Sequence, residues 1–307
     1  MDAVTVDVAG RRLRLTNLDK VLYPDSGFTK AEVIDYYTRI APTMLPHLWN
    51  RPVTLTRWPD GVAAEPFFTK NVPPHAPPWL RREKVPTGAG SGSTVEAVFV
   101  DDVAGLVFLA NLAALEIHVP QWRVGPAGVQ LPDLLVIDLD PGAPADVVQC
   151  CEVALLAREL LTADGLDPAV KTSGSKGLQL LAPVRPKDAE ETSRYARRLA
   201  TNLAIALPGL VVDRMDRSVR AGRVFVDWSQ NHVAKNTVAP YSLRGRAKPT
   251  VSAPVTWREV ASCRSASDLR FGPDQVLDRV ATEGDLLRWT AIDPATGAGA
   301  PELPRHS

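Results

Sequence analysis

The pattern of apolar and polar residues predicts that the chain begins with a β-hairpin followed by a helix. Residues 3–15 alternate between apolar and polar positions and turn near Ala9 and Gly10, which is typical of a small hairpin. Thr29 and Glu32 form a capping-box pattern, and the apolar residues after them recur at helical spacing. We therefore expect a helix from about residue 30 to the low forties.

The stretch up to residue 120 combines extended chain with a buried helix. Residues 52–86 are rich in proline and tryptophan, which favours extended chain and turns, and residues 84–94 are rich in glycine and serine and predict a mobile loop. Residues 103–115 are apolar on nearly every side, as in a buried helix. The alternating segment LEIHVPQW then predicts a strand with Glu116 and His118 on one face.

The second half of the chain predicts an α/β (α+β) fold, because strand patterns alternate with helix patterns. Residues 292–307 have a composition that predicts a disordered tail after one domain spanning 1–291. The elements predicted in this half are a strand at 134–142, a helix at 145–164, two strands joined by a glycine turn within 170–184, a helix at 188–206 and a strand within 222–230.

Composition and charge exclude several classes of protein. With 307 residues, 45% of them hydrophobic, the chain can bury a substantial core. Lys plus Arg and Asp plus Glu number 35 each, so no global positive field indicates nucleic acid or an anionic membrane, and such binding needs local patches. The N-terminus lacks an apolar signal segment and no run approaches ~18 apolar residues, so we expect neither export nor a membrane span.

The cysteines also indicate where the protein works. Cys150, Cys151 and Cys263 are an odd number without a C-x-x-C pair. This argues against a disulfide framework and against structural zinc, so we expect a protein of the reducing cytoplasm.

Two carboxylates interrupt the apolar segment LLVIDLDPG at residues 134–142. On a strand, Asp138 and Asp140 would point to the same face about 7 Å apart at their backbones, so both could reach one divalent cation or a close pair. Carboxylate oxygens select Mg²⁺ or Mn²⁺ over thiophilic metals. The alternative is a strand end at which one aspartate caps the next turn, because Asp-Pro-Gly favours a turn.

A third acid, Asp227, lies in the β-rich segment VFVDW. If it converged on the first two, the three acids would complete a two-metal site, in which one ion activates a nucleophile and the other holds a polyphosphate leaving group. The alternative is an aspartate paired with a nearby arginine. Basic side chains that would suit a triphosphate or a nucleic-acid backbone flank it, namely Arg217, Arg220, Arg223, Lys235, Arg244, Arg246 and Lys248.

The turn TSGSKGLQ, residues 172–179, could bind phosphate. Its glycines free successive backbone N–H groups, and Ser173, Ser175 and Lys176 add two hydroxyls and one cation. It is not the G-x-x-x-x-G-K-[ST] phosphate loop, because its spacing and its strand-turn-strand context differ. Alone it is weak evidence, since most glycine turns only reverse the chain.

Taken together, LVIDLDPG, TSGSKGLQ, SVRAGRVFVDWSQN and TVAPYSLRGR closely resemble the polymerase domain of bacterial, including mycobacterial, ligase D, in the archaeo-eukaryotic primase superfamily. The resemblance extends from about Leu15 to Trp289 and includes TNLDKVLYP, TKAEVIDYY, RPVTLTRWPDG and ALEIHVPQW. Several motifs in the family's order make it specific. It implies a primase-type catalytic core with a central mixed β-sheet, flanking helices and an N-terminal elaboration.

The resemblance implies a template-dependent nucleotidyltransferase that extends primers with NTPs or dNTPs by two-metal catalysis, with Mn²⁺ preferred and Mg²⁺ as the other metal. It would fill short gaps or broken ends in DNA repair and end joining, often with ribonucleotides. The family's metal-binding acids fall on Asp138, Asp140 and Asp227. The implied partners are DNA with a gap or end bearing a 5′-phosphate, nucleoside triphosphates, and Ku or a ligase, and the implied location is the cytoplasm, at the bacterial nucleoid.

The resemblance also assigns residues to the two substrates. Contacts with the incoming nucleotide are implied for Ser173, Lys176, Arg220, Gln230 and Arg244, with His118 near the same pocket. A grip on the 5′-phosphate of the downstream strand is implied for Asn17, Lys20 and Lys30. Phe67 and Phe68 match an aromatic pair that stacks against DNA, a contact typically worth ~1–3 kcal/mol per base. Without the resemblance, these two residues would be interpreted as core.

One position departs from the family pattern. The family turn commonly ends GSKGxH, with the histidine near the nucleotide phosphates, whereas this chain has Gln179. Glutamine donates hydrogen bonds but cannot become cationic or act as a general acid. We expect a nucleotide contact at Gln179 with weaker phosphate binding or altered nucleotide choice. We do not expect a dead enzyme, because all three acids are present.

Two other classes of function compete with the polymerase. A D-x-D glycosyltransferase with Mn²⁺ would explain Asp138 and Asp140 but leaves Asp227 and the arginine cluster unexplained. A non-catalytic module that recognises DNA gaps or ends would keep the fold for binding, yet three acids facing DNA without metal would repel its phosphates. The resemblance includes neither a ligase nor a nuclease domain, so a stand-alone paralogue and a domain cut from a larger ligase both remain open.

Overall fold

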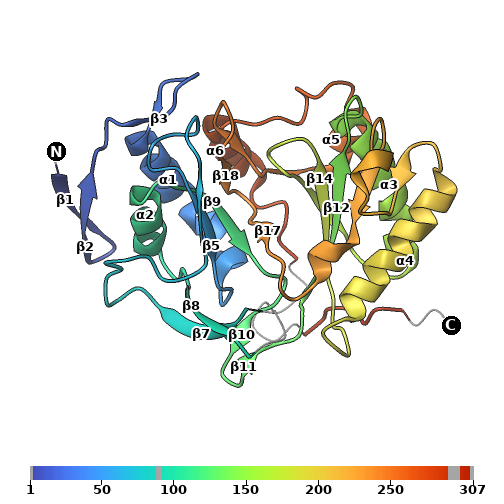
Figure 1. Ribbon diagram of the computed structural model, residues 1–307, viewed down its shortest axis with the longest axis horizontal. Coiled ribbons are helices and arrows are strands. Elements are labelled where there is room, and N and C mark those ends of the chain that lie inside the picture. Colours follow the sequence, from blue (N-terminus) through green and yellow to red (C-terminus); the bar gives the residue numbers. More distant parts are fainter. Residues whose placement is uncertain (1–2, 88–91, 290–297, 305–307) are drawn as a thin grey trace. The chain divides into compact units, whose positions relative to one another are not determined.

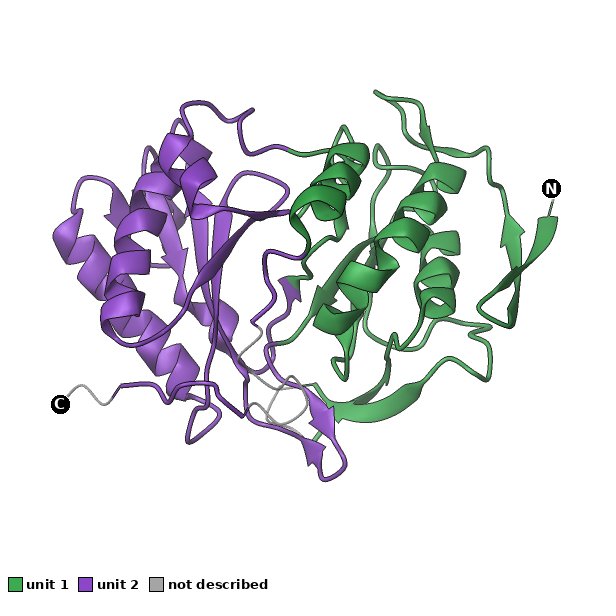
Figure 2. Cartoon of the chain, turned by 180° about the vertical axis from the view of Figure 1, so that it is seen from behind, with its two compact units in different colours: residues 1–120, 238–252, 271–284 green, residues 121–237, 253–270, 285–307 purple. Residues whose placement is uncertain are grey.

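The computed structural model of the protein describes residues 3–87, 92–289 and 298–304 (Figure 1). It contains two compact units, each built from separate stretches of the chain (Figure 2). Unit 1 comprises residues 1–120, 238–252 and 271–284, and unit 2 comprises residues 121–237, 253–270 and 285–307. The domain predicted over 1–291 therefore draws on both units, and its boundary stays a prediction.

Unit 1 begins with the predicted hairpin of β1 (Ala3–Val8) and β2 (Arg11–Thr16). Its helices are α1 (Lys30–Leu48), α2 (Val103–Asn111) and α6 (Pro273–Glu283). Its four-stranded sheet contains, in spatial order, β17 (Thr237–Val238), β9 (Ala114–Val119), β5 (Thr54–Arg57) and β6 (Phe67–Thr69). Short antiparallel pairs are β3 (Val21–Tyr23) with β4 (Phe28–Thr29), β7 (Arg82–Pro86) with β8 (Thr94–Val98), and β18 (Leu243–Arg244) with β19 (Thr250–Val251).

Helix α1 is longer than the sequence predicted. It has the expected capping box, in which Glu32 N donates to Thr29 Oγ1 at 3.3 Å. It continues through two prolines to Leu48, although a proline inside a helix costs ~3 kcal/mol. Burying a large apolar side chain contributes roughly 1.5–3 kcal/mol, and Ile40, Met44 and Leu48 are all fully buried. Packing of this face therefore offsets the prolines.

Unit 2 is built on a six-stranded sheet of order β15-β16-β12-β14-β13-β20. Strand β12 (Leu134–Pro141) is central, antiparallel to β14 (Leu178–Pro183) on one side and to β16 (Val224–Asp227) on the other. Because β15 (Val211–Val212) is parallel to β16, the sheet is mixed, as predicted. The outer strands on the other side are β13 (Ala169–Thr172) and β20 (Pro254–Val255).

Helices cover this sheet and connect its strands. Helix α3 (Val147–Ala163) packs against β12 and β14, and α4 (Glu191–Ala206) packs against β12 and β15 (Figure 1). The α/β class predicted from the sequence is therefore confirmed. The remaining elements are α5 (Trp257–Ser262), the pair β10 (Val124–Gly125) and β11 (Gly128–Val129), and the 3₁₀-helices η1 (Arg217–Val219) and η2 (Trp228–Asn231).

Parts of the two segments expected to be mobile or disordered lie within the described residues. Strands β7 and β8 pair across the glycine-rich loop predicted at 84–94, and residues 88–91 of it lie outside the described residues. In the predicted tail, Arg185 N donates to Pro301 O at 2.9 Å, and Leu303 is buried. The disordered tail predicted over 292–307 stays a prediction, and these contacts show where its residues 298–304 lie against unit 2. Residues 292–297 and 305–307 lie outside the described residues.

None of the helices that the structure describes is both long enough and apolar enough to cross a membrane.

Candidate active site

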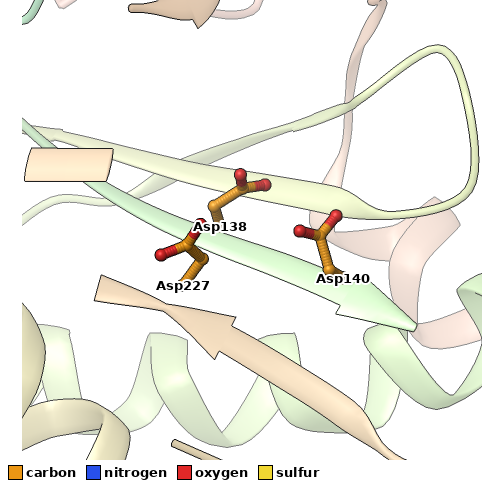
Figure 3. A group of neighbouring side chains, drawn as sticks. All are labelled: Asp138, Asp140 and Asp227. Carbon is orange, nitrogen blue, oxygen red and sulfur yellow. The ribbon is translucent and has the colours of Figure 1, made fainter. Parts of the chain in front are cut away.

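Unit 2 brings the three predicted acids together on two neighbouring strands. Asp138 and Asp140 lie on β12, and Asp227 ends β16 directly opposite Asp138. Alternate side chains share a face of a strand and opposed residues share a face of a sheet, so the three carboxylates lie on one face (Figure 3). One carboxylate oxygen of each lies within 4.8 Å of the others. Such a group could hold a divalent cation.

The sequence of β12 explains how acids can occupy the middle of a sheet. The alternate residues of the strand are fully buried and anchor its other face in the core, namely Leu135, Ile137 and Leu139. Beyond the strand, a Cβ on Gly142 would lie 2.1 Å from Arg220 O. Glycine is therefore required where the segment carrying Arg220 crosses the end of β12, and Gly142 N donates to Arg223 O at 2.8 Å there.

Asp138 is the buried member of the group, with 6% of its surface exposed, whereas Asp227 is half-buried and Asp140 exposed. Burial and the carboxylates of Asp140 and Asp227 raise the pKa of Asp138 to about 8, against a hydrogen bond from Gln179 that lowers it. Among the described residues, no lysine or arginine hydrogen-bonds directly to Asp138. The oxygen ligands that the group offers are those that Mg²⁺ and Mn²⁺ prefer.

Asp227 is fixed by the turn that follows it. Ser229 donates to Asp227 Oδ1 from its backbone N at 3.1 Å and from its hydroxyl at 2.6 Å, and Gln230 Nε2 donates to Asp227 Oδ2 at 3.2 Å. The buried Asn231 then pairs with the backbone of Val136 on β12, accepting from its N at 2.9 Å and donating to its O at 2.6 Å. The arginine partner considered for Asp227 is absent from the described residues.

Two polar atoms near this group have no partner within the described part of the chain. Arg220 Nε and Gln230 Oε1 are both buried without a hydrogen bond. The Arg220 guanidinium lies 3.6 Å from the centre of the Phe225 ring and donates to Met215 O at 2.7 Å, so its position is set from two sides. Buried polar atoms are nearly always satisfied, which indicates that a polar ligand completes this region.

The turn at 172–179 does not present the free backbone amides that its glycines suggested. Gly174 N donates to Thr172 Oγ1 at 3.3 Å, and Ser173 Oγ accepts from Ser175 N at 3.3 Å and from Gly177 N at 3.1 Å. These amides therefore stabilise the turn itself. Gly177 is required for a different reason, because a Cβ there would lie 2.0 Å from Leu139 O.

The two residues at the end of this turn face different surroundings. Lys176 is exposed, as a phosphate ligand would need to be. Gln179 is buried on β14, and its Nε2 donates to Asp138 Oδ1 at 3.0 Å. The amide of Gln179 is thus directed at the acid group.

Unit 1 holds His118 and Arg244 together through an acid that sequence analysis had only placed on a strand. Glu116 on β9 is buried, and its carboxylate accepts from Arg244 Nε at 2.9 Å and lies 2.9 Å from His118 Nε2. Gly245 N adds a bond to Glu116 at 3.1 Å. Burial raises the pKa of Glu116, but the hydrogen bonds and charges of His118 and Arg244 outweigh burial and bring it to about 2.

Unit 1 also brings together the residues matched to a 5′-phosphate. Lys30 N donates to Lys20 O at 2.9 Å, and Lys20 N donates to Asn17 O at 3.1 Å. The side chain of Lys30 is buried and donates to Thr16 O at 2.6 Å, whereas Lys20 pairs with Asp60 at 2.8 Å on the surface. Burial, and next the charge of Lys20, lower the pKa of Lys30 to about 8.

Phe67 and Phe68 are surface residues. They lie on β6, the edge strand of the sheet in unit 1, and are 58% and 64% exposed. Their exposure contradicts the core interpretation that composition alone favours. Large exposed aromatic side chains side by side are typical of a contact surface.

Comparison with known proteins places the chain in a family. Residues 29–287 match the model of the LigD primase-polymerase domain. The chain is 49% identical over 277 residues to the multifunctional non-homologous end joining protein LigD of Mycolicibacterium smegmatis, covering 90% of this chain and 36% of that protein. It is 33% identical over 275 residues to the bifunctional LigD of Bacillus subtilis, covering 89% of this chain and 43% of that protein.

A solved structure agrees with these matches. The polymerase domain of Mycobacterium tuberculosis ligase D, determined in complex with DNA, superimposes with a TM-score of 0.83 at 46% identity and covers 90% of this chain and 96% of that domain. The chain thus spans little more than a third of the mycobacterial LigD proteins but nearly all of the solved polymerase domain. The matches confirm the predicted fold and the class of DNA-directed nucleotidyltransferase. This chain belongs to the LigD primase-polymerase domain family.

Proposed function

We propose that this chain extends DNA 3′ ends, under the direction of a template, across short gaps and at broken ends that carry a downstream 5′-phosphate. The observation that carries the proposal is the group of Asp138, Asp140 and Asp227, whose ligand oxygens converge within 4.8 Å around a buried carboxylate to which no described lysine or arginine donates directly. A divalent cation would supply a positive charge in direct contact with it.

The three acids would hold one or two such cations, Mn²⁺ or Mg²⁺. When bound, the cation supplies Lewis-acid polarisation of a phosphate oxygen and of a hydroxyl nucleophile. The protein fixes the ligands in advance, since β12 and β16 set the spacing and Ser229 and Gln230 hold Asp227. Pre-set ligands reduce the reorganisation that binding requires.

The incoming nucleoside triphosphate would meet polar side chains beside the three acids. In unit 2, the unsatisfied Nε of Arg220 and the exposed ammonium of Lys176 can donate to phosphate oxygens, and the unsatisfied Oε1 of Gln230 can accept from a sugar hydroxyl. The residues proposed for this substrate, as the family pattern implies, are Ser173, Lys176, Arg220, Gln230, His118 and Arg244; the pattern also implies Gln179, whose amide is directed at Asp138.

DNA would be held by unit 1. The cations of Lys20 and Lys30, with Asn17 beside them, suit a terminal phosphate, and the exposed rings of Phe67 and Phe68 suit stacking on a base. We further propose that the activity serves end joining in the bacterial cytoplasm, at the nucleoid, with Ku or a ligase as partners. Mn²⁺ as the preferred metal belongs to the same proposal.

Primer extension on a short gap tests the function. The substrates are a gap of one to a few nucleotides with and without a downstream 5′-phosphate, in Mn²⁺ or Mg²⁺, with ribo- or deoxyribonucleotides. We expect templated extension that Asp138→Asn and Asp227→Asn each abolish while binding to the gapped DNA is retained. Asp167→Asn removes an exposed carboxylate of the same unit and should extend at the wild-type rate.

The alternatives predict other results. A recognition module would bind the phosphorylated gap without extending it in either metal. A D-x-D glycosyltransferase would show neither extension nor a preference for the 5′-phosphate. Loss of DNA binding in step with loss of extension in Asp138→Asn would contradict the assignment of this acid to the cation.

A further inference from the structure

A row of four polar residues crosses the sheet of unit 2. Asp227 on β16 lies opposite Asp138 on β12, Asp138 lies opposite Gln179 on β14, and Gln179 lies opposite Lys171 on β13. Directly opposed side chains share a face of a sheet. The row therefore contains two acids, a glutamine and a lysine, with no apolar residue between them. Gln179 and Lys171 lie 41 and 33 residues from Asp138 in the sequence.

The row is linked by hydrogen bonds in a fixed direction. Lys171 is 0% exposed, and its Nζ donates to Gln179 Oε1, while Gln179 Nε2 donates to Asp138 Oδ1 at 3.0 Å. An ammonium can only donate and an ionised carboxylate can only accept, so the amide of Gln179 has a single orientation that satisfies both neighbours. Lys171 therefore determines how Gln179 presents itself to Asp138.

This arrangement leaves one oxygen of Asp138 available. Oδ1 is held by Gln179, whereas Oδ2 accepts no hydrogen bond from the residues that the structure describes. A lysine in direct contact would neutralise the carboxylate and compete with a metal ion for its oxygens. Placed behind a neutral amide, the lysine supports the negative charge of Asp138 without occupying the ligand position, as outer partners of metal ligands do.

We propose that Lys171 and Gln179 are a positioning pair that holds Asp138 for a divalent cation, so that Gln179 serves the cation and not the phosphates of the nucleotide. The inference rests on the proposed function, because it requires that the three acids bind a cation. It assigns a role to Lys171, which no sequence motif singled out. It also gives the position at which this chain departs from the family pattern a role of its own.

Binding of Mn²⁺ to the full chain, without DNA or nucleotide, separates the two roles because no phosphate is present. Lys171→Met removes the first bond of the row and Gln179→Met removes both, and each introduces an apolar side chain of similar length. Measured by isothermal titration calorimetry, each should weaken Mn²⁺ binding by about 10- to 100-fold, the usual effect of losing an outer partner of a metal ligand. The double variant should be no weaker than the weaker-binding single variant, because both residues act through one amide.

Primer extension adds a readout that a purely structural role would not change. The half-saturating Mn²⁺ concentration should rise about 10- to 100-fold in each variant, while the rate at saturating Mn²⁺ stays closer to wild type. The matched control is Lys187→Met, which removes an exposed lysine of the same unit and should leave Mn²⁺ affinity unchanged. Circular dichroism confirms folding, and the double variant keeps the test valid if a single variant with one unpaired polar group does not fold.

The outcomes separate the pair from the site that it serves. Wild-type Mn²⁺ affinity in Lys171→Met and Gln179→Met, combined with weakened binding in Asp138→Asn, overturns the positioning pair and leaves the proposed function intact. Absence of Mn²⁺ binding in the wild-type protein, or unchanged binding in Asp138→Asn, overturns the cation site itself. Additive losses in the double variant would contradict action through a shared amide.

Discussion

Each unit of the chain buries a carboxylate on a strand, and the two carboxylates have opposite surroundings. Asp138 on β12 is buried beside Asp140 and Asp227, and its pKa rises to about 8. Glu116 on β9 is also buried, but His118 and Arg244 outweigh that burial, and its pKa falls to about 2. Glu116 has its partners within the chain and fixes the side chains of His118 and Arg244. The charge of Lys171 reaches Asp138 only through Gln179, so an oxygen of Asp138 stays available to a cation from outside the chain.

Lys30 extends the comparison to positive charge. It is buried, donates to the backbone and hydroxyl oxygens of Thr16, and has no acidic partner within the described ranges. Burial and the nearby charge of Lys20 lower its pKa to about 8. Among the described residues, neither Lys30 nor Asp138 is in direct contact with a side chain of opposite charge. A buried charged side chain without a direct partner of opposite charge, such as Lys30 or Asp138, therefore indicates a ligand of opposite charge. A paired one, such as Glu116, indicates a role in holding its partners in place.

The largest effect is expected from Asp138→Asn, which removes the carboxylate charge and keeps an acceptor for Gln179. Extension should fall below detection, because a cation ligand is lost. The metal-free protein should nevertheless become more stable at neutral pH, because a carboxyl whose pKa is raised on folding opposes folding above its ordinary pKa. Calorimetry in a chelator should show a melting temperature raised by roughly 2–4 °C, the shift that about 1 kcal/mol gives in domains of comparable size. A lowered melting temperature in Asp138→Asn would contradict the conclusion that the carboxyl of Asp138 opposes folding in the metal-free protein.

Glu116→Ala should have the reverse effect on stability. It leaves the guanidinium of Arg244 buried without its carboxylate, and removing one partner of a buried pair costs about 3–5 kcal/mol. Urea unfolding followed by tryptophan fluorescence measures the loss. Asp35→Ala provides the control, because it removes an acid from an exposed ion pair of the same unit and should cost less than about 1 kcal/mol. Equal losses of stability in Glu116→Ala and Asp35→Ala would contradict the conclusion that the ion pair of Glu116 contributes more than an exposed one.

The contribution of Glu116 should depend on pH in a defined direction. Its pKa is lowered in the folded state, so its stabilisation is present above the ordinary glutamate pKa of about 4.3 and is lost as the pH falls toward about 2. The difference in unfolding free energy between wild type and Glu116→Gln should be constant above about pH 5.5 and shrink by about 2–3 kcal/mol toward pH 2. Urea titrations at several pH values measure this difference. If this difference in unfolding free energy grew as the pH fell, the pKa of Glu116 would not be lowered in the folded state.

The smallest effect concerns Lys30 and pH on the alkaline side. Because the pKa of Lys30 is lowered to about 8, it loses its charge as the pH rises through that value. The preference for gapped DNA with a 5′-phosphate over the same gap without it should fall by up to about tenfold between pH 7 and 9, as one charge-assisted contact of about 1.4 kcal/mol is lost. Fluorescence anisotropy measures both affinities.

Two variants complete the test of Lys30. Lys30→Met should lose the preference at every pH, because it has no charge to titrate. Lys84→Met removes an exposed lysine of the same unit and should keep both the preference and its pH dependence. A preference that survives in Lys30→Met would show that another group recognises the phosphate.

Sequence reasoning found the acids because their signal is local. Asp138 and Asp140 follow the period of a strand, and Asp227 interrupts another apolar run, so each departs from its immediate neighbours. Glu116, Lys171 and Asn231 carry no such signal. Their roles come from pairing with residues on other strands, and a polar residue with a distant partner looks like any surface residue until the register of the sheet is known.

The fold was predictable to a similar degree and for similar reasons. The hairpin predicted at 3–15 lies where its period indicated, and the helix predicted at 103–115 begins where expected but ends at Asn111, because β9 begins at Ala114. The extension of α1 past its prolines and the docking of Leu303 depend on burial against remote parts of the chain. The amides of the turn at 172–179 could not be assigned either, because the rotamers of Thr172 and Ser173 decide which donors they satisfy.

The side chain of Asn231 connects the site to the folding of the chain. Because β16 ends at Asp227, the amide of Asn231 takes the place of a strand residue and pairs with Val136. Asn231 thus ties the turn that holds Asp227 to β12, and the three acids are together only when β12 and β16 are paired. A cation that needs all three ligands binds the native state alone, and its concentration then sets how far the folding equilibrium of unit 2 is displaced toward the native state.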